Sequence, residues 1–291
     1  MIVTRLIGGL GNQMFQYAAG KALALKHGVD VKADLSELNR DAEGKYTQRH
    51  YELTIFSSNI KTAAESDLTP FLNKDKSKIK RELQRRFPFL FKTLTAVESG
   101  SSYHPEFEKY PENTYLQGFW QSELYFKEYE KEIRKAFQFN QTIIEACKSF
   151  SDMIQHSNSV SLHIRRGDYV NNPSANKFHG LCSPQYYENA VKHIAALQGQ
   201  IEIIVFSDDI AWCKENLKFD FPIHFLETGS AYNDLYLMTQ CRHNIIANSS
   251  FSWWGAWLNA HPDKIVVGPK QWFADMSVNT SDILPVSWIR L

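Results

Sequence analysis

Residues 2–25, IVTRLIGGLGNQMFQYAAGKALAL, decide the fold. A short, mostly apolar stretch at residues 2–7 breaks at Gly8-Gly9, and apolar residues then follow at helical spacing. These apolar residues are Phe15, Ala18, Ala19, Ala22, Leu23 and Leu25. A strand, a glycine turn and a helix in this order predict the opening of an α/β domain.

The second half of the chain predicts further strands and helices in alternation. Residues 159–164 alternate as a strand does, residues 184–197 carry a proline near a helix start, and residues 201–206 form a continuous β-branched run. Shorter strands are expected at residues 223–226, 244–247 and 264–267. The alternation predicts an α/β fold with two Rossmann-like domains, which we place at residues 1–150 and 151–291.

The composition excludes several classes of protein. The 291 residues carry 32 Lys plus Arg and 32 Asp plus Glu, so the chain lacks the basic excess of a nucleic-acid binder. The four cysteines, Cys147, Cys182, Cys213 and Cys241, have no zinc-site spacing and suggest reduced thiols. Neither a signal peptide nor a transmembrane segment is evident in the sequence. We therefore expect a cytoplasmic protein.

One segment allows a peripheral membrane contact. Residues 73–86, NKDKSKIKRELQRR, are strongly basic and precede Phe87-Pro88-Phe89-Leu90-Phe91. Such a pattern suits an anionic membrane surface. A solvated helix followed by core aromatic residues is the preferred interpretation, and we assign the segment no function.

The first polar cluster is the turn Gly8-Gly9-Leu10-Gly11-Asn12-Gln13. Glycines let a ligand approach the backbone, and the helix that follows offers unpaired N–H groups. Met14 stands where a dinucleotide fingerprint needs its third glycine, so an NAD site is not expected. Gly9, Gly11, Asn12 and Gln13 are candidate ligand-binding residues, and a tight structural turn is the alternative.

The second cluster is His163-Ile164-Arg165-Arg166-Gly167-Asp168-Tyr169, at the end of a predicted strand. Open α/β sheets bind ligands at the carboxyl ends of their strands. The planar fork of arginine binds phosphate oxygens in pairs, so one arginine can hold a diphosphate while the other pairs with Asp168 or another carboxylate. A surface salt-bridge cluster is the alternative.

The third cluster, Ser207-Asp208-Asp209, also follows a predicted strand. Its carboxylates suit a metal, a ribose or the N1–H and amino groups of guanine. Adjacent aspartates point in different directions, and the chain contains no Asp-x-Asp triplet, so a metal is not expected. The alternative is an N-cap, a position that favours Ser and Asp.

The fourth cluster begins at Asn248-Ser249-Ser250 and continues as FSWWGAWL. Hydroxyls directly after a strand predict another helix N-terminus, which suits an anion. Trp254, Trp257 and Leu258 share a helical face, so the indoles are expected in the core. The four clusters together indicate a ligand that carries a diphosphate.

The amino-acid sequences of these four clusters resemble those of a known family. GGLGNQMFQYA, HIRRGDY, VFSDD and NSSFSWWGAWL occur in the order seen in α-1,2-fucosyltransferases of glycosyltransferase family 11, and the resemblance runs from Leu6 to about Pro269. It implies a GT-B-like fold, with two Rossmann-like domains facing each other across a cleft. It also implies GDP-fucose as donor, inversion at the sugar carbon, and no cofactor or required metal.

The resemblance implies a role for each candidate residue. Arg165 is expected on the β-phosphate, with Arg166 and His163 supporting the loop or the fucose. The other positions are expected to bind the donor, with Asp208 or Asp209 at guanine or ribose, Ser249 and Ser250 at the diphosphate, and Asn12 towards the sugar. Asp168 is the nominated general base, ahead of His179 and Glu188.

The implied reaction is transfer of fucose to the 2-hydroxyl of a terminal galactose in lactose, N-acetyllactosamine or a glycan precursor. The sequence resembles bacterial members of the family, which act on capsule, lipopolysaccharide or oligosaccharide precursors. Two alternatives remain open. One is a fucosyltransferase of another linkage or a protein O-fucosyltransferase, and the other is a protein that binds a GDP-sugar without turnover.

Overall fold

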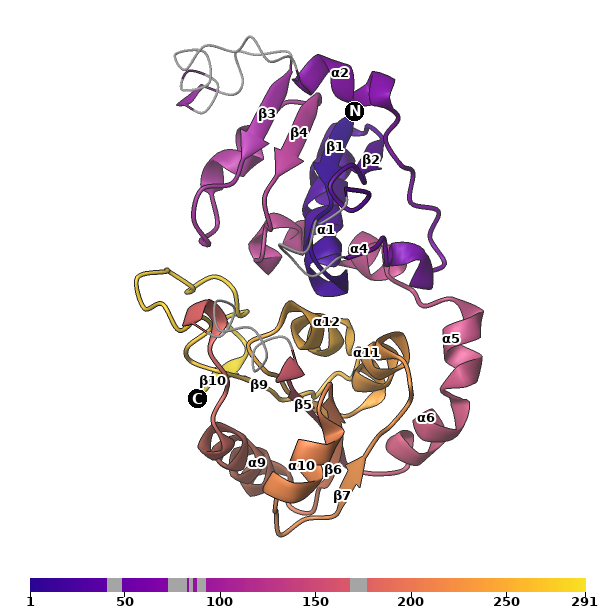
Figure 1. The fold of residues 1–291 in the computed structure, drawn as a ribbon, viewed down its shortest axis with the longest axis vertical. Helices are drawn as coiled ribbons and strands as arrows, with labels where there is room; N and C mark the ends of the chain where they lie inside the picture. Colours follow the sequence, from indigo (N-terminus) through magenta and orange to yellow (C-terminus); the bar gives the residue numbers. More distant parts are fainter. Residues whose placement is uncertain (41–48, 73–82, 84–85, 88–92, 168–176) are drawn as a thin grey trace. The chain divides into compact units, whose positions relative to one another are not determined.

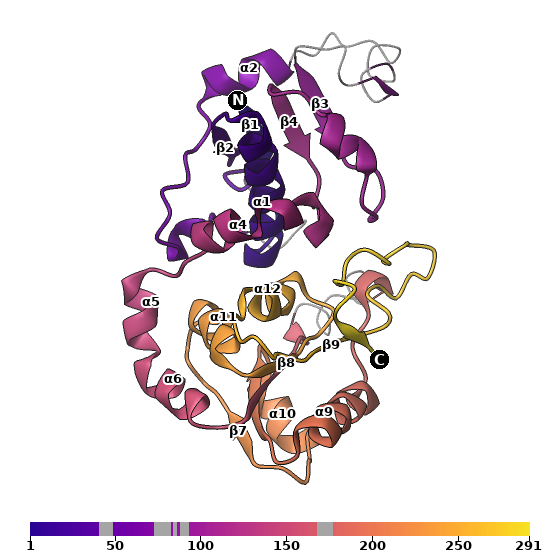
Figure 2. The same cartoon turned by 180° about the vertical axis from the view of Figure 1, so that it is seen from behind.

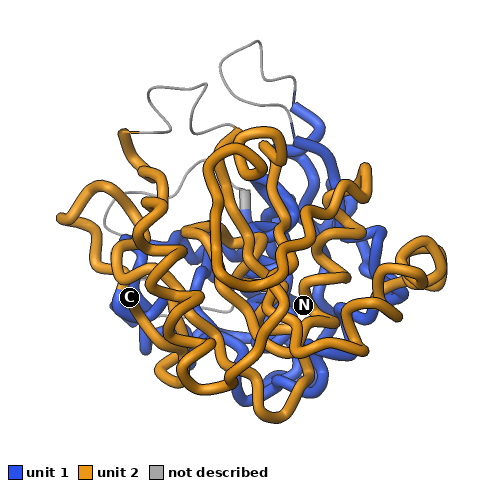
Figure 3. Tube along the Cα trace, turned by 90° about the horizontal axis from the view of Figure 1, so that it is seen from below, with its two compact units in different colours: residues 1–138, 281–283 blue, residues 139–280, 284–291 orange. Residues whose placement is uncertain are grey.

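The computed structural model describes residues 1–40, 49–72, 83, 86–87, 93–167 and 177–291. The chain forms two compact units (Figure 3). Unit 1 comprises Met1–Gln138 and Ser281–Ile283, and unit 2 comprises Phe139–Thr280 and Leu284–Leu291. The units divide at residues 138/139 rather than at residue 150, because α5 (Gln141–Ala146) and α6 (Lys148–Gln155) pack against α11 (Ala231–Gln240) of unit 2.

Unit 1 contains a parallel four-stranded sheet in the order β2-β1-β4-β3 (Figure 1). Its strands are β1 (Ile2–Arg5), β2 (Val31–Asp34), β3 (Leu94–Val97) and β4 (Thr114–Gln117). Its α-helices include α1 (Leu10–His27), α2 (Glu65–Leu72) and α4 (Glu130–Ala136), and short 3-10 turns cover Leu53–Ile55, Pro105–Lys109, Glu123–Tyr125 and Lys127–Tyr129.

Helix α1 packs directly on the sheet of unit 1. A Cβ at Gly20 would lie 3.0 Å from Cβ of Thr4, so the missing side chain sets the close approach of α1 to β1. The hydroxyl of Thr4 donates to the backbone carbonyl of Gln16 at 2.9 Å. The helix ends at Gly28, whose φ of 63° is the left-handed conformation common at helix C-termini. The predicted strand, glycine turn and helix at the start of the chain are confirmed.

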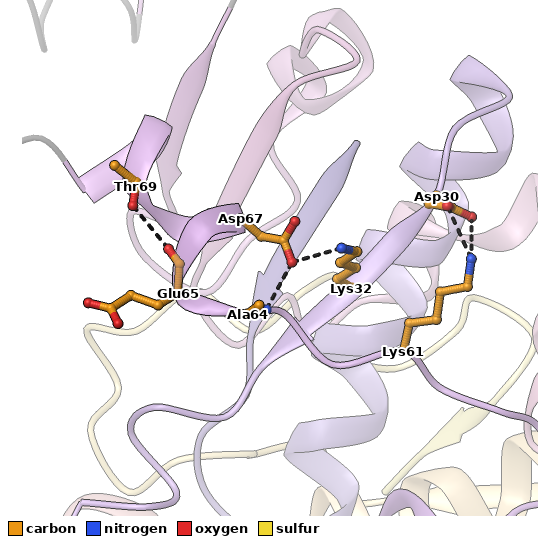
Figure 4. Close-up of polar contacts among 7 residues, drawn as sticks. All are labelled: Asp30, Lys32, Lys61, Ala64, Glu65, Asp67 and Thr69. Carbon is orange, nitrogen blue, oxygen red and sulfur yellow. Dashed lines mark hydrogen bonds and ion pairs between the residues drawn. The ribbon is translucent and has the colours of Figure 1, made fainter.

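The outer edge of β2 is covered by the segment that leads into α2 (Figure 4). Ala33 donates its N–H to Lys61 and accepts from Ala63, which forms an isolated parallel bridge. Two ion pairs flank this bridge, Lys32 with Asp67 at 2.7 Å and Lys61 with Asp30 at 3.1 Å. A covered edge cannot pair with another chain, so these contacts protect the sheet.

Unit 2 contains a parallel six-stranded sheet in the order β10-β9-β8-β5-β6-β7 (Figure 1). Its strands are β5 (Ser159–Ile164), β6 (Glu202–Ser207), β7 (Ile223–Phe225), β8 (His243–Ile245), β9 (Val266–Gly268) and β10 (Ile289–Arg290). Among the described residues, its remaining helices include α9 (Pro184–Gln198), α10 (Ile210–Asn216), α11 (Ala231–Gln240) and α12 (Ser250–Leu258).

Helices cover both faces of this sheet. Ile203 and Val205 of β6 share a buried cluster with residues of α9 and α10, whereas Ile204 and Phe206 pack with residues of α6 and α11. Helix α12 lies beside α11 (Figure 2), and a Cβ at Gly255 would lie 2.9 Å from Cβ of Met238. The strands expected near residues 160, 203, 224, 245 and 266 are confirmed.

Candidate active site

Three loops of unit 2 lie at the carboxyl end of its sheet. Strands β8, β5 and β6 are parallel neighbours, so residues 246–250, 165–167 and 208–209 follow them at the same end. This is where open α/β sheets hold ligands. The topology therefore brings together three of the four polar clusters singled out in the sequence.

Arg165 and Asp208 form an ion pair in this place. Nη1 of Arg165 lies 2.7 Å from Oδ2 of Asp208, and both side chains are about three-quarters buried, with 25% and 26% exposed. The other oxygen of Asp208 accepts the backbone N–H of Arg166 at 2.8 Å. A Cβ at Gly167 would lie 2.7 Å from Oδ2 of Asp208, so only glycine lets the carboxylate approach the backbone here. Asp208 thus fixes the start of the loop that presents Arg165.

Arg166 pairs with the second carboxylate and with an aromatic ring. Its Nε lies 3.1 Å from Oδ2 of Asp209, and its guanidinium carbon lies 3.9 Å from the centre of the Trp212 ring. Asp209 is also the N-cap of α10, because Oδ1 accepts the N–H of Trp212 at 3.1 Å. The N-cap alternative holds for Asp209. The stacking of Arg166 on Trp212 was not predicted, although Trp212 follows Asp209 at a spacing that places it in the first turn of α10.

Two histidines lie within electrostatic reach of Arg165. His163 is the penultimate residue of β5, has 5% of its surface exposed, and packs its ring against Phe251 with centroids 5.5 Å apart. Burial lowers the pKa of His163 to about 4. The negative charge of Asp208 raises this pKa, and the positive charge of Arg165 lowers it. Burial also lowers the pKa of His179, and Arg165 acts in the same direction. His163 is therefore neutral at pH 7.

Asn248 has a structural role that the sequence did not predict. Its Nδ2 donates to the carbonyls of His179 at 2.9 Å, Trp272 at 3.2 Å and Gly180 at 3.3 Å. Its Oδ1 accepts from the thiol of Cys182 at 3.5 Å. The side chain joins two loops beside the candidate site, so its amide is already committed within the protein, and it is not retained as a donor ligand.

The two serines that follow start helix α12, as expected. Ser249 is the N-cap residue and Ser250 the first residue of the helix. Within the part of the chain that the structure describes, no side chain caps this helix, and its first turn carries no acidic residue. A helix start of this kind favours an anion. The indoles of Trp253, Trp254 and Trp257 are buried in the core, as expected.

The glycine turn belongs to unit 1. Gly8 has a φ of 75°, and Gly9 is the N-cap of α1. The carbonyl of Gly9 accepts the N–H groups of Asn12 at 3.0 Å and Gln13 at 3.1 Å. Gly11 is buried in the first turn of the helix. The side chain of Asn12 accepts a hydrogen bond from Nε2 of Gln121 at 2.8 Å. Both the backbone and the side chain of Asn12 are therefore held by hydrogen bonds within unit 1.

Gln13 is a bridge inside unit 1 rather than a ligand. The side chain is fully buried, and its Nε2 donates to the carbonyls of Gly8 at 2.9 Å and His50 at 2.8 Å. Its Oε1 accepts the N–H of Glu52 at 3.0 Å. Both ends of the amide therefore hold residues 50–52 against the glycine turn.

Three further predictions concern the chemistry of the site. Asp168, the nominated base, lies outside the described residues. Glu188 lies on α9, where Gln185 donates to it at 3.4 Å, and it has no described contact with Arg165. No cluster of three or more His, Cys, Asp or Glu side chains suited to a metal occurs among the described residues.

The sequence also missed a set of residues in unit 1. The carboxylate of Glu98 accepts the backbone N–H groups of Phe119 and Trp120, and Gln121 binds Asn12. These residues follow β3 and β4, at the carboxyl end of the sheet. No motif carries them, because Glu98 recognises backbone groups more than 20 residues away.

The geometry agrees with comparisons to known proteins. The model of Glycosyl transferase family 11 matches residues 1–291. The chain belongs to this family. It is 36% identical to an α-1,2-colitosyltransferase of Escherichia coli, over 100% of this chain and 99% of that protein. It is 38% identical to the O-antigen biosynthesis glycosyltransferase WbnK of Escherichia coli, over 98% and 99% of the two chains.

Solved structures of fucosyltransferases show the same fold as this family 11 member. The α-1,6-fucosyltransferase NodZ, co-crystallised with GDP, superposes with a TM-score of 0.52 at 12% identity, over 87% of this chain and 90% of that chain. Together with the two parallel sheets, this likeness identifies the fold as GT-B-like. Across the described residues, no helix combines the length and apolar character needed to cross a bilayer.

Proposed function

We propose that this family 11 enzyme transfers a 6-deoxyhexose from a GDP-linked donor to the 2-hydroxyl of a terminal galactose, with fucose as the sugar. The observation that carries the proposal is the Arg165 guanidinium, held by Asp208 at the carboxyl end of β5 beside the start of α12. This arrangement offers a fixed positive charge and helix N–H groups to a diphosphate.

The chemistry of inverting transfer fits these parts. Cleavage of the bond between fucose and phosphate builds negative charge on GDP and positive charge on the sugar ring. Preorganised donors such as Arg165 and the helix start would stabilise the leaving diphosphate, each by about 3 kcal/mol. Ser249 and Ser250 are proposed to donate to the same phosphate oxygens. Because the charge is supplied by the protein, we propose that no metal or cofactor is required.

The pairing of Arg165 with Asp208 revises the role of this carboxylate. Asp208 accepts from Arg165 and from the N–H of Arg166, so we propose that it orients the arginine rather than reads guanine. Asp209 caps α10 and pairs with Arg166. Neutral His163 is proposed to support the Arg165 loop, because a protonated ring would repel the guanidinium.

Asp168 remains the proposed general base for the acceptor hydroxyl. An inverting reaction needs a base on the face of the sugar opposite the leaving phosphate. If Asp168 has this role, Asp168→Asn lowers kcat for transfer and leaves the affinity for the donor nearly unchanged. A loss confined to donor affinity would make Asp168 a partner of the arginines instead.

A second donor is favoured by one observation. The relative that matches the whole chain at 36% identity is an α-1,2-colitosyltransferase, and colitose is fucose without its 3-hydroxyl. The two candidates share the GDP moiety, the 6-methyl group and the linkage, so the diphosphate site serves both. They differ in whether a protein group must bind the 3-hydroxyl.

The test is release of GDP from GDP-fucose and from GDP-colitose in EDTA, with and without lactose. Acceptor-dependent release from GDP-fucose, with a 2-linked fucose in the product by NMR, supports the proposal. Release from GDP-colitose alone would move the function to the second donor. Tight GDP binding with no release from either donor and any galactoside would indicate a GDP-sugar-binding protein.

A further inference from the structure

The loop after β4 in unit 1, residues 118–122, has a strained backbone. Trp120 has a φ of 54°, and it is the one non-glycine residue with a positive φ among those the structure describes. Its indole is fully buried, with ring centroids 5.6 Å from Phe107 and 5.2 Å from Tyr125. A bulky residue keeps such a conformation only where the surroundings impose it, and such positions cluster at functional sites.

Glu98 imposes this conformation from the end of β3. Its carboxylate accepts the N–H of Phe119 at 2.6 Å and the N–H of Trp120 at 3.0 Å. Gly118 makes room for it, since a Cβ there would lie 2.3 Å from Cβ of Glu98. Burial raises the pKa of Glu98, although both hydrogen bonds act in the opposite direction. A partly buried carboxylate thus fixes one turn of the backbone.

The same loop is joined to the glycine turn. Nε2 of Gln121 donates to Oδ1 of Asn12 at 2.8 Å. The Asn12 side chain packs over Gly8, where a Cβ would lie 2.7 Å from its Nδ2. Strands β1 and β4 are parallel neighbours, so these two amides meet at the carboxyl end of the sheet.

Phe119 is exposed although its backbone is fixed. The side chain has 44% of its surface exposed, whereas the neighbouring Trp120 is fully buried. Phe119 thus presents an exposed aromatic ring from a fixed backbone, two residues before the amide of Gln121, and this combination suits a pyranose sugar. The apolar C–H face of the sugar stacks on the ring, and its hydroxyls bond to amide groups that both donate and accept.

We propose that Phe119, Gln121 and Asn12 form the subsite for the terminal galactoside of the acceptor, with Glu98 as its positioning residue. The proposal rests on the proposed transfer to galactose. In a β-galactoside the C–H groups at carbons 3, 4 and 5 form one apolar face, which stacks on Phe119. The hydroxyls at the edge of the sugar bind Gln121 and Asn12.

The experiment measures the KM for lactose and the Kd for GDP in the full-length enzyme. Phe119→Ala and Glu98→Gln are each expected to raise the KM for lactose at least about fivefold, with the Kd for GDP within about twofold of wild type. Phe119→Tyr keeps the aromatic face and is expected to restore the KM. Leu197→Ala is the matched control, because Leu197 is 59% exposed near the end of α9 in unit 2.

Saturation-transfer NMR with methyl β-lactoside and GDP separates this subsite from the transfer reaction. Wild type is expected to saturate galactose protons 3, 4 and 5 most strongly, and Phe119→Ala to lose this pattern. Phe119→Ala with an unchanged lactose KM, or with an equal loss of GDP affinity, would overturn the subsite. Wild-type binding of the lactoside in this pattern without sugar transfer would overturn the proposed function alone. Absence of lactoside binding by wild type would overturn the subsite.

Discussion

Nη1 of Arg165 lies 2.7 Å from Oδ2 of Asp208, so the arginine that is proposed to bind the donor diphosphate is oriented by a carboxylate. Asp208 is itself fixed by the backbone N–H of Arg166 and by the absence of a side chain at Gly167. The direction of the guanidinium therefore depends on three consecutive residues of one loop and one aspartate of the next.

Arg165→Ala is expected to lower kcat/KM for transfer by about two to three orders of magnitude, because a charged donor to the leaving diphosphate is lost. Circular dichroism and thermal unfolding should remain close to wild type. Lys214→Ala is the control, since Lys214 forms an exposed ion pair with Glu227 in the same unit. Near-normal activity of Arg165→Ala would remove this residue from the site.

The two adjacent aspartates should separate in their effects. Asp208→Asn removes the charge that holds Arg165 and is expected to raise the KM for the donor about tenfold. Asp209→Ala loses the cap of α10 and is expected to lower the free energy of unfolding by about 1 kcal/mol. Asp209→Asn keeps a side-chain oxygen that can cap the helix, so most of the stability is expected to remain. Donor kinetics measure the KM, and denaturant titration measures the free energy of unfolding. A KM effect at Asp209 with a stability effect at Asp208 would exchange the proposed roles of the two aspartates.

Metal removal should leave the reaction unchanged. Arg165 and the N-terminus of α12 are proposed to supply the positive charge that a metal ion supplies in other transferases. Initial rates of transfer in EDTA are therefore expected to equal those in buffer supplemented with magnesium or manganese. Loss of activity in EDTA that manganese restores would contradict the proposed mechanism.

The stability of the protein should report the buried, neutral His163. Its pKa is lowered to about 4 in the folded protein from an ordinary value of 6.5. The stabilisation that the neutral ring gives the folded state is therefore complete above pH 6.5 and declines as the pH falls towards 4. Relative to His163→Gln, wild type is expected to lose about 1.4 kcal/mol of unfolding free energy per pH unit in that window. His243, whose pKa is also lowered, remains in both proteins and cancels in the comparison. A pH-independent difference would mean that His163 has an ordinary pKa.

Gln13 should behave as a structural residue. Gln13→Ala leaves the carbonyls of Gly8 and His50 and the N–H of Glu52 without their partner, so the free energy of unfolding is expected to fall by about 2–4 kcal/mol. The Kd for GDP of the folded fraction should stay near wild type. A stable variant with much weaker GDP binding would return Gln13 to the list of ligands.

The sequence predicted the sheet of unit 2 well and that of unit 1 poorly. β5, SVSLHI, alternates polar and apolar residues, and β6, EIIVFS, contains a continuous apolar run, so both give a clear signal. β2, VKAD, and β4, TYLQ, are four residues long and contain polar groups, so nothing in their pattern distinguishes them from loops. They become strands because β1 pairs with both.

The sequence correctly placed three polar motifs at the ends of strands in unit 2, but it could not show which side chains are hydrogen-bonded to the backbone. Gln13 and Asn248 were expected to bind a ligand because neutral amides suit hydroxyls and phosphates. Their partners are backbone groups of distant segments, as far away as Trp272 from Asn248. The partners of Glu98 are equally remote, so sequence spacing could not reveal them.

The assignment of residues 281–283 to unit 1 restricts how family members can be recombined. Ile283 is wholly buried, and Asp282 accepts from the Ser122 hydroxyl at 2.7 Å and from the N–H of Tyr103 at 3.1 Å, before the chain returns to unit 2 and forms β10. A chimera joined once, after residue 138, would place these three residues of one parent against unit 1 of the other. An exchange of unit 1 between two family members therefore needs three junctions, with the tripeptide transplanted together with unit 1.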